Sequence, residues 1–218
     1  MNEHRGIGLT SERTRIRLVK QLKEMGVINL DVLDAIQTTP RHLFVDEGLA
    51  SRAYENTALP IGHGQTISQP YIVAKMTELL LGGPLDKVLE IGAGCGYQSV
   101  ILARFAKQVY SVERISPLAI KLRERIQQLR YRNILVKYGD GMQGWPENGP
   151  FDAILAAAAP ESVPPKLLEQ LKIGGRLVIP VGGDGHQDLL LITREDEDNY
   201  SEKKLDAVSF VPMKSGMN

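Results

Sequence analysis

The chain has 218 residues, 43% of them hydrophobic and 24% charged, which argues against a disordered protein and allows a substantial core. Its 26 basic and 26 acidic residues cancel, so the overall charge does not favour a nucleic-acid partner. The single cysteine excludes an intramolecular disulfide and disfavours a cysteine-based zinc site. We expect a cytoplasmic protein without a membrane partner, because no apolar segment resembles a signal peptide or reaches the ~20 residues that cross a bilayer.

Three helices are predicted in the first third of the chain. The first covers residues 11–25, behind a Thr-Ser pair that can cap it. The second covers 30–37 and is capped by Asn29, and the third covers 71–81 and ends at a Gly-Gly-Pro stop. Helical spacing predicts that the following side chains are buried: Leu18, Leu22, Met25, Leu30, Leu33, Ile36, Val73, Met76, Leu79 and Leu80.

From residue 86 onward, short apolar runs alternate with helical patterns. This alternation predicts an α/β fold with a doubly wound, Rossmann-like sheet that has helices on both faces. The last runs are joined by short loops, so we expect an antiparallel end to a mostly parallel sheet. The predicted strands are 87–91, 108–113, 134–138, 151–157, 176–181, 188–193 and 207–212, and the predicted helices are 97–106, 117–130 and 164–171.

The strongest local signal is VLEIGAGCGYQS, residues 88–99, where a strand runs into three glycines before a helix. Glycines permit a sharp turn and let a ligand approach the backbone. The helix N-terminus then offers free N–H groups, at the sheet edge where open α/β folds bind ligands. The spacing is G-x-G-x-G and not the dinucleotide G-x-G-x-x-G, which disfavours an NAD-dependent dehydrogenase.

Two acidic residues lie at the ends of the next two strands. Glu113 follows the glycines by about 20 residues, a position from which a carboxylate can accept hydrogen bonds from ribose hydroxyls. Asp140 in YGDG could bind an adenine amino group, with Gly141 giving close backbone access. Three adjacent strand ends would then line one nucleoside. The residues alone leave open a ligand-free tight turn and a solvated Glu113.

The stretch IGHGQTISQP, residues 61–70, has neither helix nor strand periodicity. His63 and Ser68 could form a hydrolase-like nucleophile pair. Ser68 or Gln69 could instead cap the following helix, with Pro70 in its first turn. The stretch by itself leaves both hypotheses open.

These residues resemble the class I S-adenosylmethionine-dependent methyltransferases, whose cofactor turn reads E/D-x-G-x-G-x-G. The resemblance is closer to one family, the protein-L-isoaspartate O-methyltransferases, and runs along nearly the whole chain. GQTISQP is the segment most specific to that family, and the glycine motif is less specific. Other matching segments are FVDE (44–47), ALPIGHGQTISQP (58–70), VLEIGAGCGYQS (88–99), SVER (111–114), GDG, FDAIL and FVP (210–212).

The resemblance implies a repair enzyme that methylates the free α-carboxylate of L-isoaspartyl residues in damaged proteins and peptides. Its cofactor would be S-adenosyl-L-methionine, and no metal would be needed. The implied cofactor-binding residues are Glu90, Gly92, Gly94, Gly96, Gln98, Glu113, Arg114, Asp140 and Gly141. Ser68 matches the active-site serine. The implied substrate-binding residues are Gly64, Gln65, Thr66, Ile67, Val211 and Pro212.

Such a reaction explains why the stretch 61–70 need not hold a nucleophile pair. The substrate carboxylate is already ionised at neutral pH, so no general base is required. The protein must instead align the carboxylate with the methyl donor and exclude water, and positioning can supply up to ~7–11 kcal/mol. We therefore expect Ser68 to orient the carboxylate and not to attack.

One position departs from the expected pattern. We expect a threonine near Ala157 in DAILAAAAP, and its loss removes a hydroxyl near the site. The same segment lacks the N/D-P-P-Y-type motif of a base-modifying RNA methyltransferase. A small-molecule methyltransferase or a non-catalytic S-adenosylmethionine-binding module are the remaining alternatives.

We expect a monomer with one domain, 1–218. Residues 1–83 would provide the N-terminal helices and the substrate loop, and 84–218 the cofactor-binding α/β core.

Overall fold

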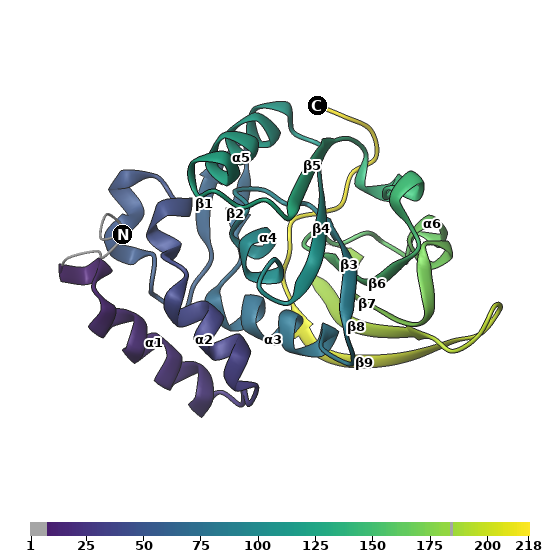
Figure 1. Cartoon of the computed structure of the whole chain (residues 1–218), viewed down its shortest axis with the longest axis horizontal. Helices are drawn as coiled ribbons and strands as arrows, with labels where there is room; N and C mark the ends of the chain where they lie inside the picture. Colours follow the sequence, from purple (N-terminus) through teal and green to yellow (C-terminus); the bar gives the residue numbers. More distant parts are fainter. Residues whose placement is uncertain (1–7, 184) are drawn as a thin grey trace.

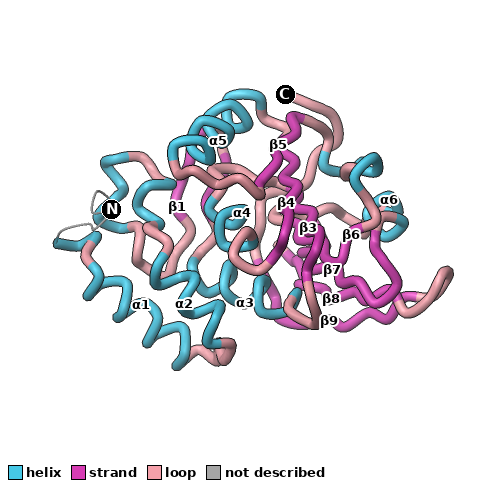
Figure 2. The backbone as a smooth tube through the Cα atoms, viewed as in Figure 1, coloured by secondary structure: helices cyan, strands magenta, loops and turns pink. Residues whose placement is uncertain are grey.

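The computed structural model describes residues 8–183 and 185–218 and is built around a seven-stranded sheet (Figures 1 and 2). The strand order is β5-β4-β3-β6-β7-β8-β9. All neighbours from β5 to β7 are parallel, and β8 and β9 are antiparallel. The predicted Rossmann-like sheet with an antiparallel end is therefore confirmed. The strands are β3 (Leu85–Ile91), β4 (Ala106–Glu113), β5 (Ile134–Tyr138), β6 (Phe151–Ala156), β7 (Leu171–Gly183), β8 (His186–Arg194) and β9 (Tyr200–Val208).

Helices cover the two sheet faces unequally. One face packs against α3, α4 and α5, with α1 and α2 outside them in the same core cluster, and α6 with short turns covers the other face (Figure 1). Neighbouring strand residues such as Val88 and Leu89 are both fully buried but belong to opposite faces, as β geometry requires. The α-helices are α1 (Glu12–Glu24), α2 (Leu30–Thr38), α3 (Pro70–Leu80), α4 (Tyr97–Leu102), α5 (Ser116–Gln128) and α6 (Pro165–Glu169). The 3₁₀ turns are η1 (Gly8–Thr10), η2 (Arg41–Phe44), η3 (Glu47–Arg52), η4 (Gly141–Gln143) and η5 (Pro146–Asn148).

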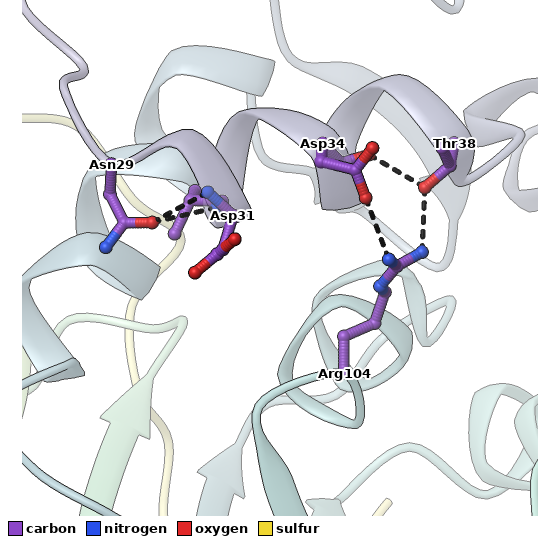
Figure 3. A network of polar contacts seen from close by, with 6 residues as sticks. Asn29, Asp31, Asp34, Thr38 and Arg104 are labelled. Atoms are coloured by element: carbon purple, nitrogen blue, oxygen red, sulfur yellow. Dashed lines mark hydrogen bonds and ion pairs between the residues drawn. The ribbon is translucent and has the colours of Figure 1, made fainter.

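The predicted cap of α2 is confirmed, since the Asn29 side chain accepts hydrogen bonds from the N–H groups of Asp31 and Val32 (Figure 3). At its other end α2 is tied to the turn after α4 by Arg104. That guanidinium donates to Thr38 Oγ1 at 2.7 Å and to Asp34 Oδ2 at 2.9 Å (Figure 3). These contacts fix the N-terminal helices against the α/β core.

Two residues that we expected to be buried are exposed. Leu30 is 69% exposed and Met25 is 41% exposed. A three-residue spacing drifts by about 60° per step around a helix, so the buried stripe of α2 centres on Val32 and Ile36 and leaves Leu30 outside. Met25 is the C-cap of α1, where the chain already leaves the helix.

The stretch 61–70 contains a hairpin, which corrects its interpretation as irregular. Strands β1 (Leu59–Gly62) and β2 (Gln65–Ile67) are antiparallel and joined by His63 and Gly64. Both turn residues have positive φ, 53° and 68°, as a type I′ hairpin turn requires. The strands have only three and four residues, too few for an alternating pattern to emerge.

The last strand lies earlier than predicted. Residues 207–212 were expected to form it, whereas β9 ends at Val208. Most of β9 is polar and exposed, so hydrophobic patterning does not mark it. The apolar residues that follow leave the sheet edge. The Gln187 side chain hydrogen-bonds both the N–H and the C=O of Phe210, and Pro212 then forms an isolated bridge with Ala159.

The helix predicted at 97–106 is also shorter, because the chain turns after Leu102 and Ala106 already pairs with β3. Within the described residues, no helix is both long and apolar enough to cross a membrane.

Candidate active site

A cavity of about 360 Å³ lies at the carboxyl ends of β3, β4 and β6. The β1–β2 hairpin and the segment after β9 enclose it opposite the glycine turn. A volume of this size is typical of a small-molecule site. Most of the predicted site residues line it: Gly64, Gln65, Thr66, Ile67, Ser68, Gly92, Gly94, Gln98, Glu113, Arg114, Gly141, Val211 and Pro212.

Glu113 brings a carboxylate to the cavity wall, and hydrogen bonds fix the orientation of that carboxylate. It is 4% exposed, and its Oε2 accepts the Gly94 N–H at 2.7 Å. Its Oε1 accepts the Ile115 N–H at 2.8 Å. Two fixed N–H donors hold the carboxylate in one orientation, and each oxygen keeps a lone pair for a further donor such as a ribose hydroxyl.

Glu90 was expected to contact the cofactor, and the structure corrects this. Its side chain is fully buried beneath the turn and accepts hydrogen bonds from Ser99 at 2.5 Å and Ser111 at 2.6 Å. Burial raises the pKa of Glu90 to about 7, although the two serine hydroxyls act against this rise. Glu90 therefore supports the glycine turn from inside the core.

Gly96 also lies outside the cavity wall. Its φ is +87°, and a Cβ there would lie 2.2 Å from Leu122 Cδ1 on α5. The backbone conformation and the close packing of α5 thus require a glycine here, and its contact with the cofactor stays a prediction.

Asp140 is near the cavity but is not part of its wall. Its Oδ1 accepts the Met142 N–H at 2.9 Å, and its Oδ2 accepts the Gly216 N–H at 2.8 Å. The neighbouring Gly141 does line the cavity, and a Cβ there would meet Ile91 Cγ2 at 2.5 Å. Both Asp140 oxygens thus accept one backbone N–H each, as the Glu113 oxygens do, so a contact of Asp140 with an adenine stays a prediction.

Residues 213–218 form a part of the site that the sequence did not predict. Met213, Lys214 and Asn218 line the cavity. Asn218 exchanges two backbone hydrogen bonds with the start of α5, donating to Arg114 O and accepting from the Ser116 N–H, both at 2.8 Å. Figure 1 shows this segment in yellow, ending near α5. No local pattern in these residues indicates such a contact, because its partners are about a hundred residues away.

The structure supports neither of the two interpretations of Ser68 that the stretch itself left open. Gln69 is the N-cap of α3, and within the described chain no side chain caps this helix. Within residues 8–183, Ser68 and His63 share no hydrogen bond, and His63 is exposed at the hairpin turn. Ser68 is half-buried at the cavity wall, available to a ligand.

Two other residues of the cavity bear on its chemistry. Cys95 is buried, and burial raises the pKa of its thiol, which disfavours a thiolate nucleophile. Ala157, the position where we expected a threonine, lines the cavity, and its N–H donates to Ile91 O at 2.8 Å. Across residues 8–183 and 185–218, no group of three acidic, histidine or cysteine side chains could hold a metal.

Comparison with known proteins agrees with this geometry. A family model described as protein-L-isoaspartate(D-aspartate) O-methyltransferase matches residues 13–218. The protein-L-isoaspartate O-methyltransferase of Cellvibrio japonicus (strain Ueda107) is 59% identical over 215 residues, covering 97% of this chain and 96% of that protein. The one of Pseudomonas paraeruginosa (strain DSM 24068 / PA7) is 56% identical over 209 residues, covering 95% and 99%.

Solved structures show the same likeness. A protein-L-isoaspartate O-methyltransferase superposes with a TM-score of 0.84 at 27% identity, covering 93% of this chain and 67% of that one. A beta-aspartate methyltransferase from Plasmodium falciparum, in complex with S-adenosyl-L-homocysteine, superposes with a TM-score of 0.77 at 27% identity, covering 91% and 97%. The resemblance found in the sequence is confirmed, and the chain belongs to the protein-L-isoaspartate(D-aspartate) O-methyltransferase family.

Proposed function

We propose that this member of the family transfers the methyl group inside the cavity between the hairpin and the glycine turn, with Ser68 orienting the substrate carboxylate. The protein is an S-adenosylmethionine-dependent repair methyltransferase that acts on L-isoaspartyl residues. One observation carries the proposal: Ser68 and the anchored Glu113 line the same cavity from two separate parts of the fold.

The glycine-turn wall fits the nucleoside part of the cofactor. Glu113 presents a carboxylate fixed by two N–H donors, and Gly141 adds backbone without a side chain to the same wall. Gln98 extends this wall, and its amide nitrogen is oriented by Thr77 Oγ1 at 2.9 Å. When bound, S-adenosylmethionine supplies a methyl group on a positively charged sulfur.

The hairpin wall suits a carboxylate that needs no deprotonation. The Ser68 hydroxyl can donate one hydrogen bond to the carboxylate, and we assign peptide-backbone contacts to Thr66 and Ile67. Val211 and Pro212 form the opposite side. Alignment by these groups lowers the entropic cost of bringing two reactants together, and buried apolar neighbours such as Met76 keep water out.

We propose further that the chain acts as one domain and as a monomer in the cytoplasm. Residues 1–83 contribute the substrate hairpin and 84–218 the cofactor core. Its partners would be damaged proteins and peptides that contain isoaspartate, with neither nucleic acid nor membrane as a partner.

The test uses purified protein, radiolabelled S-adenosylmethionine and two synthetic peptides that differ only in isoaspartate against aspartate. Base-labile label on the isoaspartyl peptide alone is the expected result. Cofactor binding without transfer to either peptide would contradict the proposal and favour a non-catalytic binding module.

A further inference from the structure

Arg41 is a fully buried arginine that contacts the segment bearing Ser68. It is the first residue of η2 and is 0% exposed. Its Nη2 donates to the backbone oxygen of Ser68 at 2.7 Å, and its Nε donates to the backbone oxygen of Ala53 at 2.9 Å. Its Cζ lies 4.9 Å from the centre of the Tyr97 ring. One side chain thus joins η2, the end of η3 and the Ser68 backbone.

Burying this charge is unfavourable, and the surroundings do not neutralise it. Desolvation lowers the pKa of Arg41, and in the described part of the chain no carboxylate forms an ion pair with it. Its Nη1 is buried without a hydrogen-bond partner there. Apolar residues of similar volume often stabilise a core at least as well as a buried charge. The guanidinium is therefore better explained by the two carbonyl oxygens that it holds at once.

The Ser68 backbone has few other restraints. Ser68 follows β2 and precedes Gln69, whose side chain does not cap α3. Pro70, the next residue, has no N–H to donate. The contact from Arg41 to the Ser68 oxygen thus holds the peptide plane next to the serine, and with it the position of the Cβ that carries the hydroxyl.

Arg41 is also linked to the opposite wall of the cavity. Tyr97 packs edge-on against Phe44 with ring centres 5.3 Å apart, and Phe44 belongs to η2 together with Arg41. Arg125 lies over the Phe44 ring, with its Cζ 5.4 Å from the ring centre, and donates to the Cys95 oxygen of the glycine turn at 2.7 Å. One packed row therefore places Ser68 relative to the cofactor wall.

We propose that Arg41 is a positioning residue for methyl transfer, which acts through the Ser68 backbone and touches neither substrate nor cofactor. The inference rests on the proposed role of Ser68. A displacement of about 1 Å in an aligned site can lower the rate by about 10²-fold. Loss of the clamp should consequently lower kcat while the cofactor wall keeps its affinity.

The experiment compares Arg41→Lys and Arg41→Gln with the wild type. A lysine cannot hold both carbonyl oxygens in a fixed fork, and a glutamine removes the buried charge and so remains available if the lysine variant does not fold. We expect kcat on the isoaspartyl peptide to fall at least about tenfold. The Kd for S-adenosyl-L-homocysteine should stay within about twofold of the wild-type value, since Arg41 touches no group that binds the cofactor.

Arg176→Lys is the matched control. This arginine donates to the Leu79 oxygen at 3.1 Å, so it also holds a backbone carbonyl of α3, but at the end of the helix away from Ser68. Its replacement should leave kcat within about twofold of the wild type. An equal loss in this variant would overturn the proposal, because the effect would then be general softening of α3.

A double-mutant cycle separates positioning from stability. In a Ser68→Ala background, Arg41→Lys should change kcat by less than about twofold, because the group that it positions is gone. Additive losses, or an unchanged kcat in Arg41→Lys alone, would overturn the proposal. Failure of both Arg41 variants to fold would do the same, since the residue would then serve only the core.

Hydrogen exchange of the segment 65–70 gives a readout that does not depend on turnover. With S-adenosyl-L-homocysteine bound, Arg41→Lys should exchange faster there than the wild type, and Arg176→Lys should not. If the wild type methylated neither peptide, the proposed function would fail, while this comparison would still decide whether Arg41 holds the segment. Unchanged exchange would overturn the clamp.

Discussion

The two walls of the cavity are held by different means. The glycine-turn wall is fixed locally by Glu113. Its carboxylate accepts the N–H of Ile115, two residues along the chain, and the N–H of Gly94, in the turn after the neighbouring strand β3. The hairpin wall belongs to a separate two-stranded sheet and depends on Arg41 from outside that sheet. In the proposed arrangement, the part of the site that faces an invariant cofactor is built into the central sheet, whereas the part that faces a variable peptide is attached to it.

The largest effect should come from Glu113→Ala, which removes a charge-assisted anchor from the sheet wall. Such hydrogen bonds contribute about 1.5–3 kcal/mol, so the Kd for S-adenosyl-L-homocysteine should rise by about 10- to 150-fold in titration calorimetry. Glu113→Gln keeps the side-chain shape and one acceptor oxygen, so its Kd should lie between those of the wild type and Glu113→Ala. An unchanged Kd in Glu113→Ala would mean that the two walls are not divided as described.

Glu90 lies beneath the same wall, and its raised pKa makes the free energy of unfolding depend on pH. Its folded-state pKa of about 7 lies above its ordinary value of 4.5, so the native state holds the proton more tightly. The free energy of unfolding should therefore fall as pH rises from about 4.5 to about 7, by about 3 kcal/mol in total from this group. Thermal melts should show that Glu90→Gln lacks this part of the decline. Parallel pH curves for the two proteins would refute a buried, proton-retaining Glu90.

Ser68→Ala probes the hairpin wall and should give a smaller loss. Removing one hydrogen bond to a charged group is worth about 1.5 kcal/mol, or roughly tenfold in kcat. The Kd for S-adenosyl-L-homocysteine should not change, because this wall does not hold the nucleoside. Steady-state kinetics with the isoaspartyl peptide measures both. A loss of cofactor affinity equal to that of Glu113→Ala would erase the distinction between the walls.

Ala157→Thr should have the smallest effect. The position lines the cavity between the walls, and its backbone is already bonded to Ile91 O. A restored hydroxyl should alter kcat/KM by less than about threefold, because exchange of one water contact for a protein contact is worth about 0.5 kcal/mol. A tenfold gain would show that the departure at this position weakens the enzyme.

The sequence predicted best those elements whose signal is local. The strand 134–138 and the cap of α2 by Asn29 are found where expected, since β-forming residues mark the strand and the cap binds N–H groups two and three residues away. The hairpin turn was missed because His63-Gly64 replaces the usual Asn-Gly signal. The family motif predicted the cavity residues, but the inward direction of Glu90 depends on Ser111, a residue in another strand.

The contacts of residues 213–218 could not be predicted from the sequence either. Their contacts with Asp140 and Arg114 join parts of the chain that are 76 and about a hundred residues apart, and no periodicity encodes them. Only the assembled sheet brings these ends together.

The exposed strand β9 has a consequence for an enzyme whose substrates are damaged chains. It forms one edge of the sheet, and such an edge presents unpaired N–H and C=O groups to any extended segment. Its outward side chains include Glu202, Lys203 and Lys204, all exposed. Closely spaced charges of this kind disfavour intermolecular strand pairing, which protects the repair enzyme from aggregating with the partly unfolded proteins that it meets.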